Sequence, residues 1–368
     1  MPFGFTTDDW RQVDANWAAW WRGELERPII PFVVDLPDQQ NPGSIDPWWV
    51  LFNVDFSMPV NALIDGWEAS LRSRAYGCDA FPTVFPNFGP GVMAVYLGAT
   101  PEPRPEDNTV WFHPPRQLTY PDILWPYSEE SEWFQRQIAI YEECTERWQG
   151  GVQLALTDLG GNMDILATFR PGEALLLDLY DRPQDVERLL WEGHERWWQY
   201  WDRFNSVLQP TNPGYSCWAG LFSATSHYML QCDFCYMISP RMFDRFVKPE
   251  LVASCRKLDH AFYHLDGAGE LAHLDSLLEI DALAGVQWIP GDGAAPASEW
   301  VDVYRRIRAA GKLVQFQDGL DELERVAQKL GSLKGFCTFQ QWVAHDQQDD
   351  FLRRLERLGF EDLSLRTI

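Results

Sequence analysis

His264 and Asp266 carry the sharpest chemical signal in the sequence, within Tyr263-His-Leu-Asp-Gly267 at the end of an apolar run. Residues two positions apart in a β-strand point to the same face, so both side chains are expected to face the same way. An imidazole nitrogen and a carboxylate can ligate zinc, and Cys337, in the last apolar run, is the expected third ligand. The alternative is a hydrogen-bonded histidine at a strand end, with Cys337 as a small buried hydrophobic residue.

Three aspartates are the candidate catalytic groups: Asp158, Asp233 and Asp266. Asp158 and Asp164 bracket a Gly-Gly turn, so one is expected to be a general acid or base and the other a helix cap. Asp233 lies within Cys232-Asp-Phe-Cys235. That CxxC spacing suggests redox chemistry or half a zinc site, but two packed cysteines beside a useful carboxylate are the favoured interpretation.

Candidate substrate-binding residues also follow the apolar runs: Asn87, Trp218, Gln287, Trp288 and Gln317. Tryptophans at these positions, and in Asp46-Pro-Trp-Trp49, could stack on a ring-shaped substrate. No lysine or arginine belongs to the set of residues that follow the runs, so a Schiff-base lysine or a phosphate clamp is not supported.

Eight short apolar runs alternate with helical patterns, which is typical of β/α units around a parallel sheet. We therefore predict an α/β protein, a single (β/α)8 TIM barrel over residues 1–368, with the site at the carboxyl ends of the strands. An N-terminal helix is expected across the barrel base, and a long insertion between the early strands. The runs span residues 27–35, 80–85, 152–157, 215–218, 261–265, 286–289, 313–316 and 335–339.

The composition argues against some classes of binding partner. The net charge is −24, with 54 Asp and Glu against 30 Lys and Arg, which argues against nucleic acid and anionic membranes. No apolar run is long enough to span a membrane, and no signal peptide is visible. Seven scattered cysteines favour reduced thiols, so we expect a cytoplasmic protein; a homodimer is compatible with such a barrel.

Several segments resemble the uroporphyrinogen decarboxylase-like superfamily, from about Pro28 to the last strand. The segments are Phe85–Gly91, Cys232–Pro249, Tyr263–Gly269, Leu274–Asp281 and Val286–Pro290. The resemblance implies a (β/α)8 barrel and one of two chemistries. One is decarboxylation of uroporphyrinogen; the other is methyl transfer between a corrinoid protein and a thiol or similar acceptor, assisted by zinc.

The methyltransferase branch fits the residues better. True decarboxylases carry an Arg-rich motif near the first strand, where this chain has the acidic strand end at Asp35. The methyltransferases bind zinc through a His-x-Cys pair and a later Cys, which His264 and Cys337 match. Asp266 stands in place of the middle Cys, which makes the expected site poorer in thiolate.

The sequence thus predicts a zinc-assisted methyltransferase acting on a small methylated substrate or thiol acceptor, with the corrinoid on a separate protein. The alternative is a lyase or hydrolase that acts on a small cyclic substrate through the three aspartates. A third interpretation, a non-catalytic binding or assembly module, fits the ring of polar strand ends less well.

Overall fold

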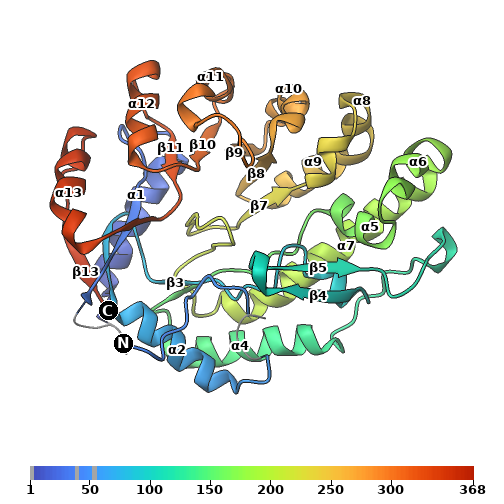
Figure 1. Ribbon diagram of the computed structural model, residues 1–368, viewed down its shortest axis with the longest axis horizontal. Helices are drawn as coiled ribbons and strands as arrows, with labels where there is room; N and C mark the ends of the chain where they lie inside the picture. Colours follow the sequence, from blue (N-terminus) through green and yellow to red (C-terminus); the bar gives the residue numbers. More distant parts are fainter. Residues whose placement is uncertain (1–3, 38–40, 52–55) are drawn as a thin grey trace.

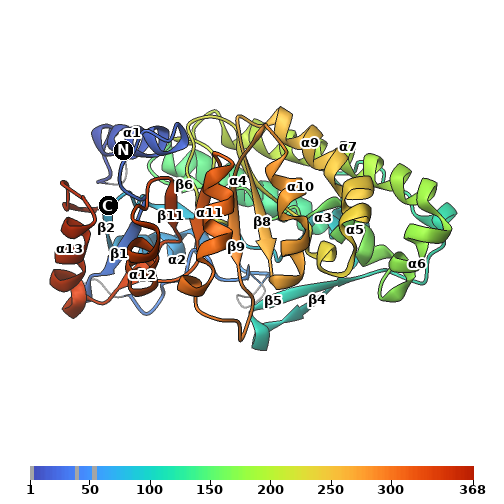
Figure 2. The same cartoon turned by 90° about the horizontal axis from the view of Figure 1, so that it is seen from above.

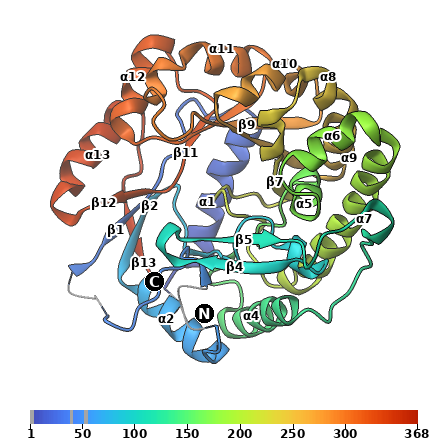
Figure 3. The same cartoon turned by 45° about the vertical axis from the view of Figure 1, so that its right-hand side comes forward.

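The computed structural model describes residues 4–37, 41–51 and 56–368, and it has the mixed α/β class that the sequence predicts. Helices surround the strands, as Figure 1 and Figure 3 show. The strands are β1 (Pro31–Asp35), β2 (Arg74–Cys78), β3 (Thr83–Val84), β4 (Thr100–Arg104), β5 (Thr109–His113), β6 (Gln153–Leu154), β7 (His227–Gln231), β8 (His260–Asp266), β9 (Leu283–Ile289), β10 (Leu313–Phe316), β11 (Phe336–Thr338), β12 (Gln341–Val343) and β13 (Leu365–Thr367).

The helices show the expected termini. Thr6 and Asp9 form a capping box at the start of α1, and the Ser239 side chain caps α8. Gly331 ends α12 with φ at +81°, a conformation that favours glycine. The helices are α1 (Thr7–Trp21), α2 (Val60–Arg72), α3 (Met93–Tyr96), α4 (Glu132–Trp148), α5 (Asn162–Phe169), α6 (Glu173–Asp181), α7 (Pro183–Leu208), α8 (Pro240–Met242), α9 (Lys248–Lys257), α10 (Leu274–Leu278), α11 (Val301–Ala309), α12 (Leu320–Leu330) and α13 (Gln348–Arg357).

The largest sheet contains five parallel strands in the order β11, β10, β9, β8 and β7. In a second sheet β1 pairs in parallel with β12 and antiparallel with β2, and β2 pairs with β13. A further parallel pair joins β3 to β6, and β4 and β5 form an antiparallel hairpin. Single parallel bridges connect Ile29 to Cys337 and Leu156 to Cys217.

Most of the predicted strands exist, but the fourth does not. Residues 215–218 make only single bridges, through Tyr215 and Cys217, whereas a full strand, β7, follows them and pairs with β8. Every residue of β7 is buried, so its sequence does not alternate between apolar and polar residues as a half-buried strand would. The prediction at this position was therefore displaced by about ten residues along the chain.

The strand pairings of the described residues form separate ladders and do not show the closed eight-stranded barrel that the sequence predicts. Both β3 and β6 are only two residues long, and Pro82 and Pro86 flank β3. Proline cannot donate a backbone hydrogen bond, so the ladder stops at these residues. The excursion expected between the early strands contains α2, β2, α3 and the hairpin of β4 and β5.

Two elements lie at opposite ends of the strands, as Figure 2 shows: α1 at one end and the hairpin of β4 and β5 at the other. The Trp21 ring of α1 stacks on His260, the first residue of β8, with ring centroids 4.3 Å apart. Helix α1 therefore covers the amino ends of the strands, as expected, and leaves the carboxyl ends for the site. None of the described helices is both long and apolar enough to cross a bilayer.

Asp79 ties the start of β1 to α1. It is fully buried, and its carboxylate accepts hydrogen bonds from both terminal nitrogens of Arg27, at 2.8 and 2.9 Å. The Ile30 backbone N–H donates at 3.0 Å and the Asn16 amide at 2.9 Å. Four donors thus satisfy this buried charge, which makes it a fixed point of the fold.

We expect Asp79→Ala to lower the free energy of unfolding by about 3–5 kcal/mol, because it leaves the Arg27 charge partly buried without its partner. Urea unfolding followed by circular dichroism measures the change. Asp8→Ala is the control, since the Asp8 side chain is 86% exposed and pairs with Arg11 at the surface. Equal midpoints for the two variants would contradict the role of Asp79.

Candidate active site at the carboxyl end of β8

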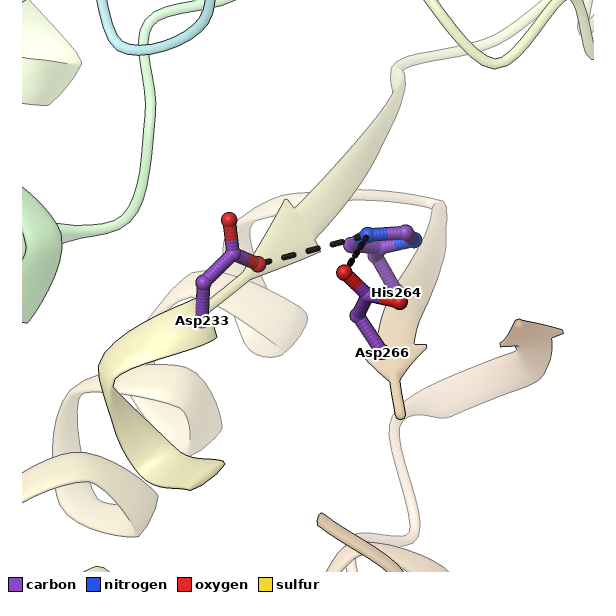
Figure 4. Close-up of side chains that lie close together, drawn as sticks. All are labelled: Asp233, His264 and Asp266. Atoms are coloured by element: carbon purple, nitrogen blue, oxygen red, sulfur yellow. Dashed lines mark ion pairs between the residues drawn. The ribbon is translucent and has the colours of Figure 1, made fainter. Parts of the chain in front are cut away.

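Asp233, His264 and Asp266 come together at the carboxyl end of β8 (Figure 4). His264 and Asp266 project from β8, and Asp233 begins the 3-10 helix η5 (Asp233–Met237) that follows β7. His264 Nε2 lies 4.0 Å from Asp233 Oδ1 and 3.9 Å from Asp266 Oδ2. One ligand atom from each side chain lies within 4.8 Å of the others, and in the described residues this is the only such group of three.

A chain of side-chain amides fixes the orientation of His264. His264 Nδ1 is hydrogen-bonded to Gln287 Oε1, Gln287 Nε2 donates to Gln315 Oε1 at 2.6 Å, and Gln315 Nε2 donates to the Ala219 carbonyl oxygen at 2.8 Å. His264, Gln287 and Gln315 are register partners across β8, β9 and β10, so the strand pairing itself aligns this relay.

The relay also determines which ring nitrogen carries the proton. The Ala219 carbonyl can only accept, so Gln315 must present its N–H groups to it. Gln315 Oε1 then accepts from the Gln287 amide, and Gln287 Oε1 faces the ring. His264 Nδ1 is therefore the donor, and in the neutral ring the lone pair of Nε2 faces Asp233 and Asp266.

Asp164 positions Asp233. From α5, its two carboxylate oxygens accept from the backbone N–H groups of Asp233, at 3.1 Å, and Phe234, at 2.8 Å. Asp164 is thus the capping member of the aspartate pair that brackets the Gly-Gly turn. Burial and the charge of Asp266 raise the pKa of Asp233, whereas the charge of His264 lowers it.

Glu270 follows β8, four residues after Asp266, and is fully buried. Neither of its carboxylate oxygens has a hydrogen-bond partner among the described side chains and backbone. Burial, followed by the charges of Asp233 and Asp164, raises the pKa of Glu270 to about 10. Glu270 is therefore a neutral acid at pH 7, which limits the negative charge gathered around the site.

Asp158 is buried beside Gln231, the register partner of His264 in β7. Its Oδ1 accepts from the Gly160 N–H at 2.8 Å. The pKa of Asp158 is raised from 3.8 to about 7. Burial is the largest cause and the charge of Asp233 adds to it, while hydrogen bonds from Gly160, Gly91 and Gln231 act in the opposite direction. A carboxyl group with this pKa can exchange a proton near neutral pH, as a general acid or base must.

Cys337 does not join His264 and Asp266. It is fully buried in β11, and its thiol donates to the Thr338 carbonyl oxygen at 3.2 Å. Cys337 pairs in register with Gln315, so three strand spacings separate it from His264 along the sheet. At about 4.8 Å for each spacing, that is roughly 14 Å of sheet, too far for one shared ion. Asp233, and not Cys337, is the third side chain that lies beside His264 and Asp266.

The two predicted tryptophans have different surroundings. Trp218 is half-buried and meets the His264 ring edge to face, with centroids 5.0 Å apart. Trp288 is fully buried and packs against Trp300 at 5.2 Å, on the face of β9 opposite to Gln287. Trp218 is therefore available to a substrate at the site, whereas the structure places Trp288 in the core.

The three predicted amide residues also differ. Gln287 is fully buried, and both ends of its amide are taken by His264 and Gln315, so it positions the histidine. The Asn87 amide donates to the Trp48 carbonyl oxygen at 3.2 Å and accepts from the Gly89 N–H at 3.0 Å, so it holds two loops together. Gln317 is exposed directly after β10.

Cys232 and Cys235 are free and buried, on either side of Asp233, which matches the favoured interpretation of two packed cysteines. Burial raises the pKa of both thiols, so neither is a ready nucleophile. Sequence reasoning missed Gln315, Gln231 and Glu270. A polar glutamine inside an otherwise apolar run was the available signal for Gln231 and Gln315. No comparable signal marked Glu270, which lies in a short 3-10 helix after β8.

The fold has a known counterpart. The structure is similar to that of a methyltransferase from Methanosarcina mazei, with a TM-score of 0.59 and 9% sequence identity, over 90% of this chain and 93% of that one. The sequence matches no protein-family model and no curated protein. At this level of identity the likeness concerns the fold, and the site must be argued from its own residues.

The raised pKa of Asp158 makes stability depend on pH. Between pH 3.8 and about 7 the folded protein holds a proton at Asp158 that the unfolded chain has released. The free energy of unfolding therefore falls as the pH rises through this range. Asparagine at position 158 does not titrate. We therefore expect the free energy of unfolding of Asp158→Asn, relative to that of the wild type, to increase by about 2–3 kcal/mol as the pH rises from about 5 to about 8. Urea unfolding at several pH values measures the difference, and a pH-independent difference would contradict the raised pKa.

Proposed function

We propose that this protein is a metal-assisted methyltransferase that acts on a small molecule, with the reaction centred on Asp233, His264 and Asp266. The observation that carries the proposal is the fixed tautomer of His264, whose free Nε2 faces two carboxylates. Metal-ligating histidines commonly donate their other ring N–H to a fixed acceptor in this way.

The residues fit a divalent cation. Ligands at about 2.1 Å in tetrahedral geometry lie roughly 3.4 Å apart, so small side-chain rotations would bring the present 3.9 and 4.0 Å distances into range. A nitrogen and two carboxylate oxygens suit zinc and neighbouring divalent metals. Three protein ligands leave a position open for substrate, which is the pattern of catalytic sites.

A bound metal would supply Lewis-acid polarisation of a methyl donor or activation of an acceptor thiol. The chain's own residues do the rest. Gln287 and Gln315 hold the His264 ring, and Asp164 holds Asp233. Asp158, with a pKa of about 7, can donate a proton to the group that loses the methyl, or accept one from the group that gains it.

We prefer methyl transfer over other metal-assisted reactions because the structure is similar to that of a methyltransferase over nine-tenths of the chain. We further propose that residues 1–368 act as one catalytic domain and that the methyl group is exchanged with a corrinoid carried by a separate protein. These last points rest on the resemblance of the sequence segments.

A second candidate is a lyase or hydrolase that acts on a small cyclic substrate. Its support is the buried Asp158, which could work with Asp233 and Asp266 in acid–base catalysis without a metal. Turnover of a cyclic substrate that survives treatment with a chelator would favour this candidate over methyl transfer.

The metal proposal predicts about one Zn²⁺ bound per chain, measured by isothermal titration and by mass spectrometry of the purified protein. His264→Ala, Asp233→Asn and Asp266→Asn should each weaken binding at least about tenfold, because each removes one ligand. Asp292→Asn is the control, since Asp292 is an exposed aspartate after the next strand. Equal affinity in Asp292→Asn and Asp266→Asn would contradict the site.

Cys337→Ser separates the two possible ligand sets. A serine hydroxyl can still donate to the Thr338 carbonyl, and Cys337 lies outside the cluster, so zinc affinity should stay within about twofold of wild type. Loss of zinc in a folded Cys337→Ser protein would show that the cysteine, and not Asp233, completes the site.

A further inference from the structure

A cavity of about 410 Å³ lies beside the metal-ligand cluster. Trp218 connects the two, since it lines the cavity and contacts the His264 ring edge to face. Ala219, which ends the amide relay, lines the cavity as well. A molecule bound in this cavity would therefore lie against the segment that contacts and orients His264.

Four aromatic side chains of the cavity wall keep surface that the described chain does not cover. Trp48, Trp218 and Phe339 are half-buried, and Trp342 is 51% exposed. Covering such apolar surface with a ligand is favourable, and aromatic side chains contact a flat ring through stacked or edge-to-face geometry. The volume is at the small end of the usual range for ligand sites, which suits a molecule built on a single ring.

The charges at the cavity are already paired. Among the described residues that line it, Asp46 is the only ionisable one, and its Oδ2 accepts from Arg74 Nη2 at 3.0 Å. The Arg74 guanidinium lies 4.3 Å from the centre of the Trp342 ring, so that ring already contacts a cation. The cavity therefore offers no unpaired positive charge to an anion, and its carboxylate is compensated against a cation.

Gln340 supplies an available polar group. It lines the cavity and is half-buried, and its side chain makes no hydrogen bond with any residue that the structure describes. Gln340 stands two residues before Trp342 at the start of β12, so alternation along the chain places both on the same side. Gln341, between them, donates instead to the Phe339 carbonyl oxygen at 2.9 Å.

A carboxamide such as that of Gln340 can donate and accept at once. It therefore complements a neutral group that also has both functions, such as another amide. A carboxylate or an amidinium would satisfy only one half of it, and either ion would lose hydration without gaining a counter-ion.

We propose that this cavity binds an uncharged aromatic ring that carries a neutral amide-like group, with the ring against the tryptophans and the polar group on Gln340. The proposal rests on the proposed function only in so far as it names the class of small molecule that would reach the reaction centre. Binding itself does not depend on methyl transfer or on a metal.

The test uses the full chain treated with chelator, so that binding to the cavity is measured apart from the metal. Ligand-observed NMR and titration calorimetry compare benzamide, benzoate and benzamidinium, which have nearly the same size and shape and differ in charge. We expect roughly millimolar affinity for benzamide, and at least about tenfold weaker binding of both ions. Affinity for either ion equal to that for benzamide, or no binding of benzamide, would overturn the proposal.

A first variant assigns the polar group of the ligand to Gln340. Gln340→Met keeps a side chain of similar length and removes both hydrogen-bonding functions, so it should weaken benzamide about fivefold and leave toluene within about twofold. Gln328→Met is the control, since Gln328 is an exposed glutamine of α12 that does not line the cavity. Unchanged benzamide affinity in Gln340→Met would contradict the assignment.

A second variant assigns the ring. Trp342→Ala should weaken both benzamide and toluene about tenfold, because it removes one aromatic wall. Its control is Trp111→Ala, since both tryptophans are about half exposed and both lie under an arginine. Equal effects of the two tryptophan variants would contradict binding of the ring in this cavity.

The outcomes separate this proposal from the proposed function. Benzamide binding without any zinc site would leave the cavity assignment standing and remove the metal-assisted reaction. Zinc binding to the aspartate and histidine cluster without benzamide binding would do the reverse.

Discussion

The direction of one backbone carbonyl, that of Ala219, governs the chemistry of the site. A carbonyl oxygen can only accept a hydrogen bond, so its contact with Gln315 orients two amides in succession and, through them, the His264 ring. The relay is buried, so each reversed amide would leave a donor or acceptor without a partner, at a cost of about 1–3 kcal/mol. The strand register makes the arrangement possible, because it places His264, Gln287 and Gln315 in one row.

The negative charge around that row is limited by burial, which keeps carboxyl groups protonated, more than by pairing with cationic side chains. The chain carries a net charge of −24, yet two buried acids, Glu270 and Asp158, whose charges interact with that of Asp233, are kept from ionising fully at neutral pH. Glu270 remains protonated, and Asp158 titrates near pH 7 because desolvation outweighs its hydrogen bonds. Two carboxylates, Asp233 and Asp266, are left to face His264, and each is partly open to solvent.

The sequence allowed the α/β class, most strands and the pairing of His264 with Asp266 to be predicted, because alternation along one strand fixes which side chains share a face. It did not allow the third member of the cluster to be chosen. Cys337 was the expected third ligand, and Asp233 was expected only as a catalytic carboxylate. The choice between them depends on strand order and spacing, which a single strand does not encode. The amide relay escaped prediction for the same reason, since its members come from three strands. Trp288 was predicted to bind substrate, but Gln287 is the residue of β9 that lies in the row with His264 and Gln315, so Trp288 points to the opposite face and into the core.

The segment from Cys217 to Gly220 explains why the cluster and the cavity occur together. It lies where the sequence predicted a strand, but Gly220 turns back on the Cys217 carbonyl with φ at +72°. The positive φ favours glycine at this position. A β-carbon at Gly220 would stand 3.5 Å from the Trp48 ring, an ordinary contact distance, so the turn packs directly against Trp48. Because the segment leaves the sheet here, Trp218 can reach His264 while the Ala219 carbonyl reaches Gln315. In a regular strand, adjacent residues point to opposite faces. The Trp218 side chain and the Ala219 carbonyl could not then both be directed at the row of His264, Gln287 and Gln315.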